Sequence, residues 1–204
     1  MKAAGRFFTR LLIGTACAAG LHGSVWAQAP DASAVPSSGP PAVMAPEDQR
    51  PEIRDLIPQY RLVGKGRLTV WGFQVYDARL WARPGFSADN LAAQTFALEL
   101  AYLRGFEKTA VAERSITEMR RSATIGEEQA RAWTVEMVRV LPNTKAGDRV
   151  TGVNRPGSGV LFLLNGKPTG EIRDAEFARL FFGIWLSPKT SEPKLRNALL
   201  AGAP

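Results

Sequence analysis

LVGKGRLTVWGFQVYDARLW, residues 62–81, is the stretch that decides the fold of this chain. It is rich in Val, Leu, Tyr, Phe and Trp, and glycines interrupt it. Residues 60–63 and 67–71 read as short extended segments, and residues 73–82 as a longer strand. Gly72, between the last two, indicates a bulge or a bend rather than a full turn. Strand signals therefore dominate the first half of the domain.

The residues that follow predict one more strand and then two helices. Residues 96–103 alternate in character, with Phe96 and Leu98 on one face of the strand and Glu99 on the other. Two apolar stripes at helical spacing come next, and Pro142 ends the second. The first stripe, with Thr109 as its N-cap, and the second consist of Ala112, Ile116, Met119 and Ala123, and of Ala130, Trp133, Met137 and Leu141.

Three further strands are predicted after these helices. Residues 148–153 lead through a Pro/Gly turn to residues 159–164. Asn165-Gly166 is a strong signal for a type I′ turn, which joins this strand to residues 167–172. These segments predict an antiparallel arrangement.

Two helices complete the domain. Asp174 caps the first, Pro188 ends it, and a short last helix runs from Ser191 through Leu199. The first helix carries a heavily aromatic stripe, made of Phe177, Leu180, Phe181, Ile184 and Trp185. Because strands and helices do not alternate along the chain, we predict an α+β fold, with a large antiparallel β-sheet and helices packed on one face.

The N-terminal part of the chain differs from the rest in composition. Residues 1–27 have the features of a secretory signal peptide, with basic residues at the start, an apolar run at 11–21 and small residues before the predicted cleavage site. That run is shorter than the about 20 residues that span a bilayer. Residues 28–51, rich in Pro, Ala and Ser, predict a disordered tether, and residues 52–204 one globular domain. We expect a periplasmic or secreted protein.

Cys17 and His22 are the only cysteine and histidine of the chain, and both lie in the predicted signal peptide. Its removal leaves no thiol and no imidazole, which excludes thiol nucleophiles, His-dependent triads, Cys/His zinc sites and disulfides. A lipoprotein site at Cys17 is disfavoured, because the residues before it lack the large aliphatic side chain that is usual there. We expect neither a metal nor a cofactor.

The charge of the chain favours no polyanionic partner. The net charge is +7, and removing residues 1–27 leaves 23 basic against 19 acidic side chains. The excess is scattered, without runs of Lys or Arg interleaved with aromatic residues. We therefore expect no binding to nucleic acid.

Five segments of the globular part resemble the chalcone isomerase-like family, in the family's order. They are residues 62–81, AERSITEM at 112–119, KAGDRVTG at 145–152, the Asn165-Gly166 hairpin and FFGIWLSP at 181–188. More narrowly, the chain resembles the exported bacterial branch of the family. The resemblance implies an open-faced sandwich, with helices against one side of a large antiparallel sheet and a ligand cleft between the two layers.

The resemblance implies two kinds of activity. Plant enzymes of this family close a chalcone into a flavanone by attack of a phenolate oxygen on an enone, which needs a cation, hydroxyls and a near-attack geometry rather than a histidine. Other relatives are non-catalytic fatty-acid binders that hold the carboxylate with an arginine and a tyrosine.

The resemblance also assigns four candidate ligand-binding residues. Arg67 aligns with the cleft arginine of the family when a short gap is allowed, and a surface arginine beside a turn is the alternative interpretation. Tyr76 falls where the enzymes have a threonine, and the alternative is a core tyrosine. Lys108 and Ser115 fall where the isomerases have a tyrosine and an asparagine. Because most of the enzyme set is altered, we predict no catalytic residue.

Three hypotheses on function follow. The first is an exported, non-catalytic domain that binds a small apolar or fatty-acid-like carboxylate ligand between sheet and helices. The second is an isomerase or lyase that cyclises an enone-type substrate, with Arg67 positioning an anionic oxygen. The third is an envelope protein-interaction module, in which the aromatic helix around residues 177–185 docks a partner.

Overall fold

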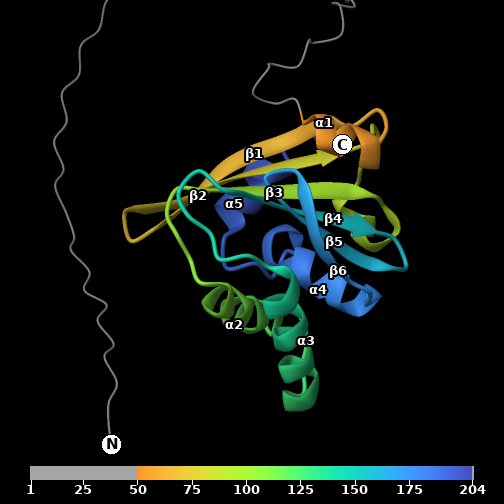
Figure 1. Ribbon diagram of the computed structural model, residues 1–204. Coiled ribbons are helices and arrows are strands. Elements are labelled where there is room, and N and C mark those ends of the chain that lie inside the picture. Colours follow the sequence, from red (N-terminus) through yellow and green to blue (C-terminus); the bar gives the residue numbers. More distant parts are fainter. Residues whose placement is uncertain (1–49, 204) are drawn as a thin grey trace, which may run out of the picture. The chain divides into compact units, whose positions relative to one another are not determined.

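The computed structural model describes residues 50–203, which fold around one six-stranded antiparallel sheet with its strands in chain order (Figure 1). The strands are β1 (Arg61–Val70), β2 (Phe73–Ala82), β3 (Phe96–Tyr102), β4 (Arg149–Arg155), β5 (Gly159–Leu164) and β6 (Lys167–Ile172). The helices are α1 (Pro51–Leu56), the 3₁₀ segment η2 (Ala88–Ala93), α2 (Lys108–Met119), α3 (Glu127–Val140), α4 (Ala175–Leu186) and α5 (Pro193–Leu199). The predicted signal peptide and nearly all of the predicted tether lie outside the described residues.

The sheet has two different faces, because side chains alternate along each strand. On β3, Phe96 and Leu98 pack into the main core together with residues of α2 to α5. The neighbouring Ala97 and Glu99 point to the opposite side, where α1 lies (Figure 1). We call these the helical face and the outer face. The predicted α+β class and the antiparallel sheet are confirmed, and α1 on the outer face is an addition to the prediction.

The helical face carries the main core, to which α4 contributes most of the aromatic rings. The Asp174 carboxylate accepts a hydrogen bond from the Phe177 N–H at 2.9 Å and caps α4 as predicted. The Phe181 ring packs edge-on against Phe162 of β5, with centroids 5.4 Å apart. Phe181 and Trp185 are only 7% and 8% exposed. The hypothesis that this helix docks a partner is therefore wrong, because its aromatic face is buried in the core.

A smaller apolar cluster lies on the outer face beneath α1. Ile53 and Ile57 are wholly buried and pack on five side chains of the sheet, namely Trp81, Ala97, Val153, Leu161 and Leu163. Pro51 begins α1, so that residues 50 and 51, at the end of the predicted tether, belong to the folded domain.

The β1–β2 hairpin differs from the prediction in two respects. Residues 61–70 form one strand, with an irregular register next to Gly64, instead of two short segments. Gly64 is needed there because a Cβ would lie 2.2 Å from the carbonyl oxygen of Ala198. Trp71 and Gly72 form a full two-residue turn rather than a bend, with φ angles of 49° and 83°. The turn was missed because type I′ turns favour Asn or Gly where this chain has Trp71.

Smaller differences concern element ends. The Asn165-Gly166 turn is confirmed, with the two positive φ angles that type I′ requires. The first long helix begins at Lys108 with Glu107 as its N-cap instead of Thr109, and the last begins at Pro193 instead of Ser191. In the part of the chain from 50 to 203, no helix has the length and apolar character needed to cross a membrane.

Candidate functional site

Tyr76 is the polar group that β2 places between the sheet and the helices. Alternation along β2 turns it to the helical face, where its hydroxyl accepts a hydrogen bond from the Trp185 indole N–H of α4 at 2.9 Å. Its ring meets the edge of Tyr102 on β3, with centroids 5.9 Å apart and planes at 75°. Tyr102 in turn lies against Phe106, at 5.6 Å between centroids. The Tyr76 hydroxyl is thus a polar spot within an aromatic surrounding.

The electrostatics of this spot keep Tyr76 protonated. Burial raises the pKa of Tyr76 well above its usual range, and the nearby carboxylates of Glu192 and Glu118 raise the pKa further, against the opposing effect of the Trp185 hydrogen bond. Burial also raises the pKa of Tyr102, to about 12. Among residues 50–203, the Tyr76 hydroxyl proton has no acceptor. The hydroxyl can therefore donate a hydrogen bond to a ligand oxygen.

Two of the predicted site residues lie on α2. Ser115 is buried, but its hydroxyl donates to the Val111 carbonyl one turn earlier, at 2.8 Å. Lys108 opens the helix, and its backbone N–H donates to the Asn143 side chain at 3.0 Å. Neither residue is hydrogen-bonded to Tyr76 in the described part of the chain, so their roles in ligand binding stay predictions.

Glu118 is a buried residue that the sequence analysis did not single out. Its side chain is 9% exposed and lies 2.5 Å from the Arg114 guanidinium and 3.8 Å from that of Arg121. The spacing of Arg114 and Glu118, four residues apart on a helix, is the sequence signal that points to this pair. This carboxylate raises the pKa of Tyr76, although the two guanidinium groups balance its charge.

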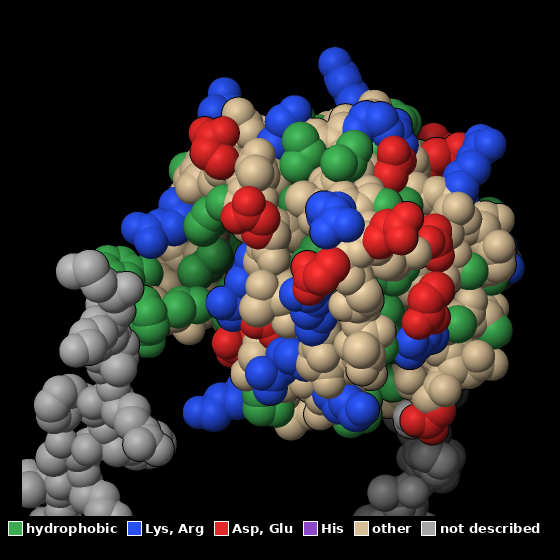
Figure 2. Space-filling model, turned by 90° about the horizontal axis from the view of Figure 1, so that it is seen from below, with side chains coloured by type: hydrophobic (Ala, Val, Ile, Leu, Met, Phe, Trp, Pro, Cys, Tyr) green, Lys and Arg blue, Asp and Glu red, His purple; other side chains and the backbone are tan. Residues whose placement is uncertain are grey.

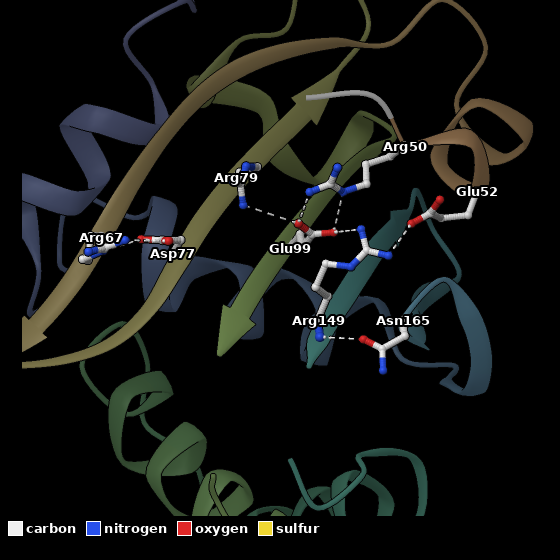
Figure 3. A network of polar contacts seen from close by, with 8 residues as sticks. All are labelled: Arg50, Glu52, Arg67, Asp77, Arg79, Glu99, Arg149 and Asn165. Carbon is white, nitrogen blue, oxygen red and sulfur yellow. Dashed lines mark hydrogen bonds and ion pairs between the residues drawn. The ribbon is translucent and has the colours of Figure 1, made fainter. Parts of the chain in front are cut away.

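Arg67 lies on the outer face, and its guanidinium binds Asp77 rather than facing the helices (Figure 3). Arg67 pairs with Asp77 across β1 and β2, one position away from the pair of Leu68 and Tyr76, so the two pairs point to opposite faces. The guanidinium makes two hydrogen bonds to the Asp77 carboxylate, at 2.5 and 2.8 Å, and one to Gln74 at 2.8 Å. The pairing lowers the pKa of Asp77, chiefly through the hydrogen bond from Arg67. The expected arginine looking into a cleft between sheet and helices is therefore wrong for Arg67.

A network of charged side chains surrounds Glu99 in the middle of the outer face (Figure 3). Glu99 is 1% exposed, and Arg50 binds it through two hydrogen bonds of 3.0 and 3.1 Å. Arg79 and Arg149 approach the same carboxylate at 3.7 and 3.6 Å. The Arg149 guanidinium also lies 3.4 Å from Glu52 of α1. Because a buried carboxylate needs such partners, we assign this network to holding α1 on the sheet.

The open ligand cleft expected between sheet and helices is not present in the described residues, because side chains of the sheet and of α2 to α5 pack there into one apolar core. The rings of Phe96 on β3 and Phe182 on α4 lie 4.7 Å apart, and Trp185 of α4 donates its hydrogen bond to Tyr76 of β2. Surface hollows among the described residues lie elsewhere, and one of them, between α3 and β6, holds about 670 Å³. None of them is lined by Tyr76. Residues 50–203 also contain no group of three His, Cys, Asp or Glu side chains able to hold a metal ion.

Comparison with known proteins agrees with the architecture. The sequence profile of the family described as chalcone isomerase-like matches residues 56–201. A Haemophilus influenzae protein described as uncharacterized is 28% identical over 139 residues, which cover 68% of this chain and 66% of the relative, just under two thirds of its length. The crystal structure of an Arabidopsis thaliana fatty-acid binding protein has the same fold, with a TM-score of 0.53 and 12% identity over 70% of this chain and 87% of that one. Since the family profile spans well over half of the chain, this protein belongs to the chalcone isomerase-like family.

Proposed function

We propose that this protein binds, without catalysis, a small and mainly apolar molecule that presents an oxygen acceptor, such as a fatty-acid-like carboxylic acid. The observation that carries the proposal is the Tyr76 hydroxyl, which is partly buried between sheet and helices, protonated and without an acceptor for its proton among the described residues. Trp185 holds the hydroxyl in place, and the rings of Tyr102 and Phe106 supply apolar surroundings.

The surroundings of Tyr76 also select the form of the head group. Glu118 and Glu192 act on Tyr76 as anions, and Arg67 faces the other side of the sheet. The guanidiniums of Arg114 and Arg121 are paired with Glu118, and neither is hydrogen-bonded to Tyr76 in the described residues, so a carbonyl or a protonated carboxylic acid would accept the tyrosine hydrogen bond at lower cost than a carboxylate. The proposed ligand therefore binds in its neutral form, more tightly as the pH falls toward the pKa of the acid.

Entry of a ligand requires side chains at the edge of the site to part. Leu68, Phe106 and Val111 are only partly buried against the core. Leu68 pairs with Tyr76 across β1 and β2, and Phe106 lies against the Tyr102 ring. These three are the least costly side chains to displace, because less apolar surface is lost from each. The fatty-acid binding protein with the same fold supports a ligand of this kind.

Binding is tested by a matched pair of tyrosine variants. Tyr76→Phe removes one hydroxyl on the helical face, and Tyr60→Phe removes one on the outer face, where Tyr60 bonds the Arg50 backbone. In competition of oleic acid with a fluorescent fatty acid, we expect Tyr76→Phe to weaken binding about tenfold, the effect of one lost hydrogen bond. Tyr60→Phe should leave the affinity unchanged. Equal affinities of both variants, or no binding by the unaltered protein together with no lipid in a mass-spectrometric extract, would contradict the proposal.

The enone isomerase remains the alternative activity within the same family. It is measured by loss of the long-wavelength absorbance of a chalcone. A rate above the uncatalysed background that falls in Tyr76→Phe would replace the binding proposal by catalysis at the same hydroxyl.

We further propose that the protein is exported and that residues 1–27 are its signal peptide. The apolar run at 11–21 and the small residues before Gln28 support this. The expected result is a periplasmic protein whose N-terminal sequence begins at Gln28. Recovery of the intact N-terminus from the cytoplasm would contradict it.

A further inference from the structure

The tip of the β1–β2 hairpin gathers most of the exposed large apolar side chains of the described residues. Five such side chains are exposed in this part of the chain, and four belong to this place: Val70, Trp71, Phe73 and Leu103. Trp71 is 94% exposed and Phe73 59% exposed. The Leu103 N–H bonds to the carbonyl of Val75, which brings the end of β3 beside the hairpin. We call these four residues, with Arg104 at their rim, the hairpin tip.

The backbone at the hairpin tip shows that Trp71 is not there for stability. Its φ angle of 49° lies in the left-handed region, which a bulky L-residue enters only with strain. Packing of its side chain does not offset this strain, because nearly all of the side chain faces solvent. Backbone strain that no packing contact offsets points to a function of the strained residue.

Charge at the rim indicates what the hairpin tip contacts. The Arg104 guanidinium lies over the Phe73 ring, 5.1 Å from its centroid, so that cation and apolar surface are presented together. Residues 65–77 and 103–108 carry four basic and two acidic side chains. The hairpin projects beyond its neighbours in Figure 1, and green apolar side chains with blue basic ones beside them lie at the same edge in Figure 2. A projecting apolar wedge with a cationic rim matches the interface of an anionic bilayer.

We propose that the hairpin tip inserts into the interfacial region of a bilayer that contains anionic phospholipid. Trp71 and Phe73 lie at the depth of the headgroups and upper acyl chains, where an amphipathic indole is favoured. Arg104 stays at the level of the phosphates. Such a contact is weak and reversible, because so few side chains enter the lipid.

The test uses full-length protein and vesicles of phosphatidylcholine with or without phosphatidylglycerol. We expect co-sedimentation with the anionic vesicles, weakened by salt, and an affinity about tenfold or more lower for Trp71→Asn. Asn accepts the same backbone angle, so this variant keeps its fold. The control is Val135→Asn, which removes the remaining exposed apolar side chain, 65% exposed on α3, and should leave binding unchanged.

A second measurement separates the hairpin tip from the apolar run at 11–21. Brominated lipid should quench the tryptophan fluorescence of the unaltered protein, and Trp71→Phe should lose most of this quenching. The proposal is overturned if the unaltered protein does not bind anionic vesicles, if Trp71→Asn binds them equally well, or if Val135→Asn binds as weakly. It is also overturned if vesicles are not bound but the protein self-associates through Trp71, which would assign the tip to contacts between copies.

Discussion

Two hairpins of this sheet turn through almost identical backbone angles with different residues. The β5–β6 turn has φ angles of 51° and 84° at Asn165 and Gly166. The β1–β2 turn has 49° and 83° at Trp71 and Gly72. Asn and Gly are the residues that this turn type favours, because both tolerate a positive φ. The same local geometry is therefore reached once with the expected residues and once against the preference of the first one.

The side chains of the two turns explain this difference. The Asn165 amide oxygen accepts the Arg149 N–H at 2.9 Å, and its NH₂ group donates to Asp148 at 3.0 Å. Asn165 is thus used twice by the fold, whereas Trp71 extends into solvent. We infer that folding selects the residue at the β5–β6 turn and that another requirement, the proposed membrane contact, selects the residue at the β1–β2 turn.

The largest expected effect comes from placing the tryptophan of one turn into the other. Asn165→Trp combines a strained bulky residue with the loss of two hydrogen bonds, one of which leaves the Arg149 N–H without its acceptor. We expect a loss of about 3 kcal/mol in the free energy of unfolding, measured by urea denaturation. A loss below about 1 kcal/mol would show that the two turns tolerate tryptophan equally.

The glycines of the two turns differ in their surroundings. Gly166→Ala and Gly72→Ala each place a Cβ on a residue with positive φ, at a cost of about 1 to 2 kcal/mol. The added Cβ at Gly166 would lie 3.2 Å from the Glu52 carboxyl carbon, whereas at Gly72 it would meet nothing within 4 Å. We therefore expect Gly166→Ala to be the more destabilising variant in thermal denaturation. A larger loss of stability for Gly72→Ala than for Gly166→Ala would show that crowding against Glu52 does not add to the cost at Gly166.

Trp71→Asn should stabilise the protein. Asn is better accommodated in the left-handed region. Because Trp71 is 94% exposed, replacing it removes almost no buried apolar surface. The expected gain is about 1 kcal/mol, or roughly 2–4 °C in the melting temperature by calorimetry. A lower melting temperature would mean that Trp71 makes stabilising contacts, and would remove the argument that it is retained for binding.

The smallest expected effect is a pH dependence confined to the β5–β6 turn. The hydrogen bond from Asn165, followed by that from the Lys145 N–H, lowers the pKa of Asp148. Because the folded-state pKa lies below the unfolded one, Asp148 stabilises the fold at neutral pH, and this contribution disappears as the pH falls below about 4. Asp148→Asn should lose less stability than the unaltered protein between neutral pH and this range. Parallel pH profiles of the two proteins would exclude the effect.

Local signals in the amino-acid sequence predict the structure correctly. The alternation of Phe96 to Tyr102, the Asn165-Gly166 turn and the Asp174 cap each depend on residues close together in the chain, and all three are confirmed. The prediction was wrong for Arg67, whose neighbours predict a strand but not its face. Tyr76 and Asp77 are adjacent residues with opposite environments, and only pairing with β1 settles which of them Arg67 meets.

The antiparallel sheet and the order of strands and helices could be read from the amino-acid sequence, because periodicity, turn chemistry and capping act over a few residues. The family was recognised from the resemblance of five segments. The tertiary structure alone decided that Arg50 reaches Glu99 across 49 positions and that Trp185 bonds Tyr76 across 109. It also decided that α1 covers the outer face. Such contacts depend on how the sheet and its helices pack, and burial there turns ordinary polar side chains into an ion-pair network around Glu99 and a protonated hydroxyl at Tyr76.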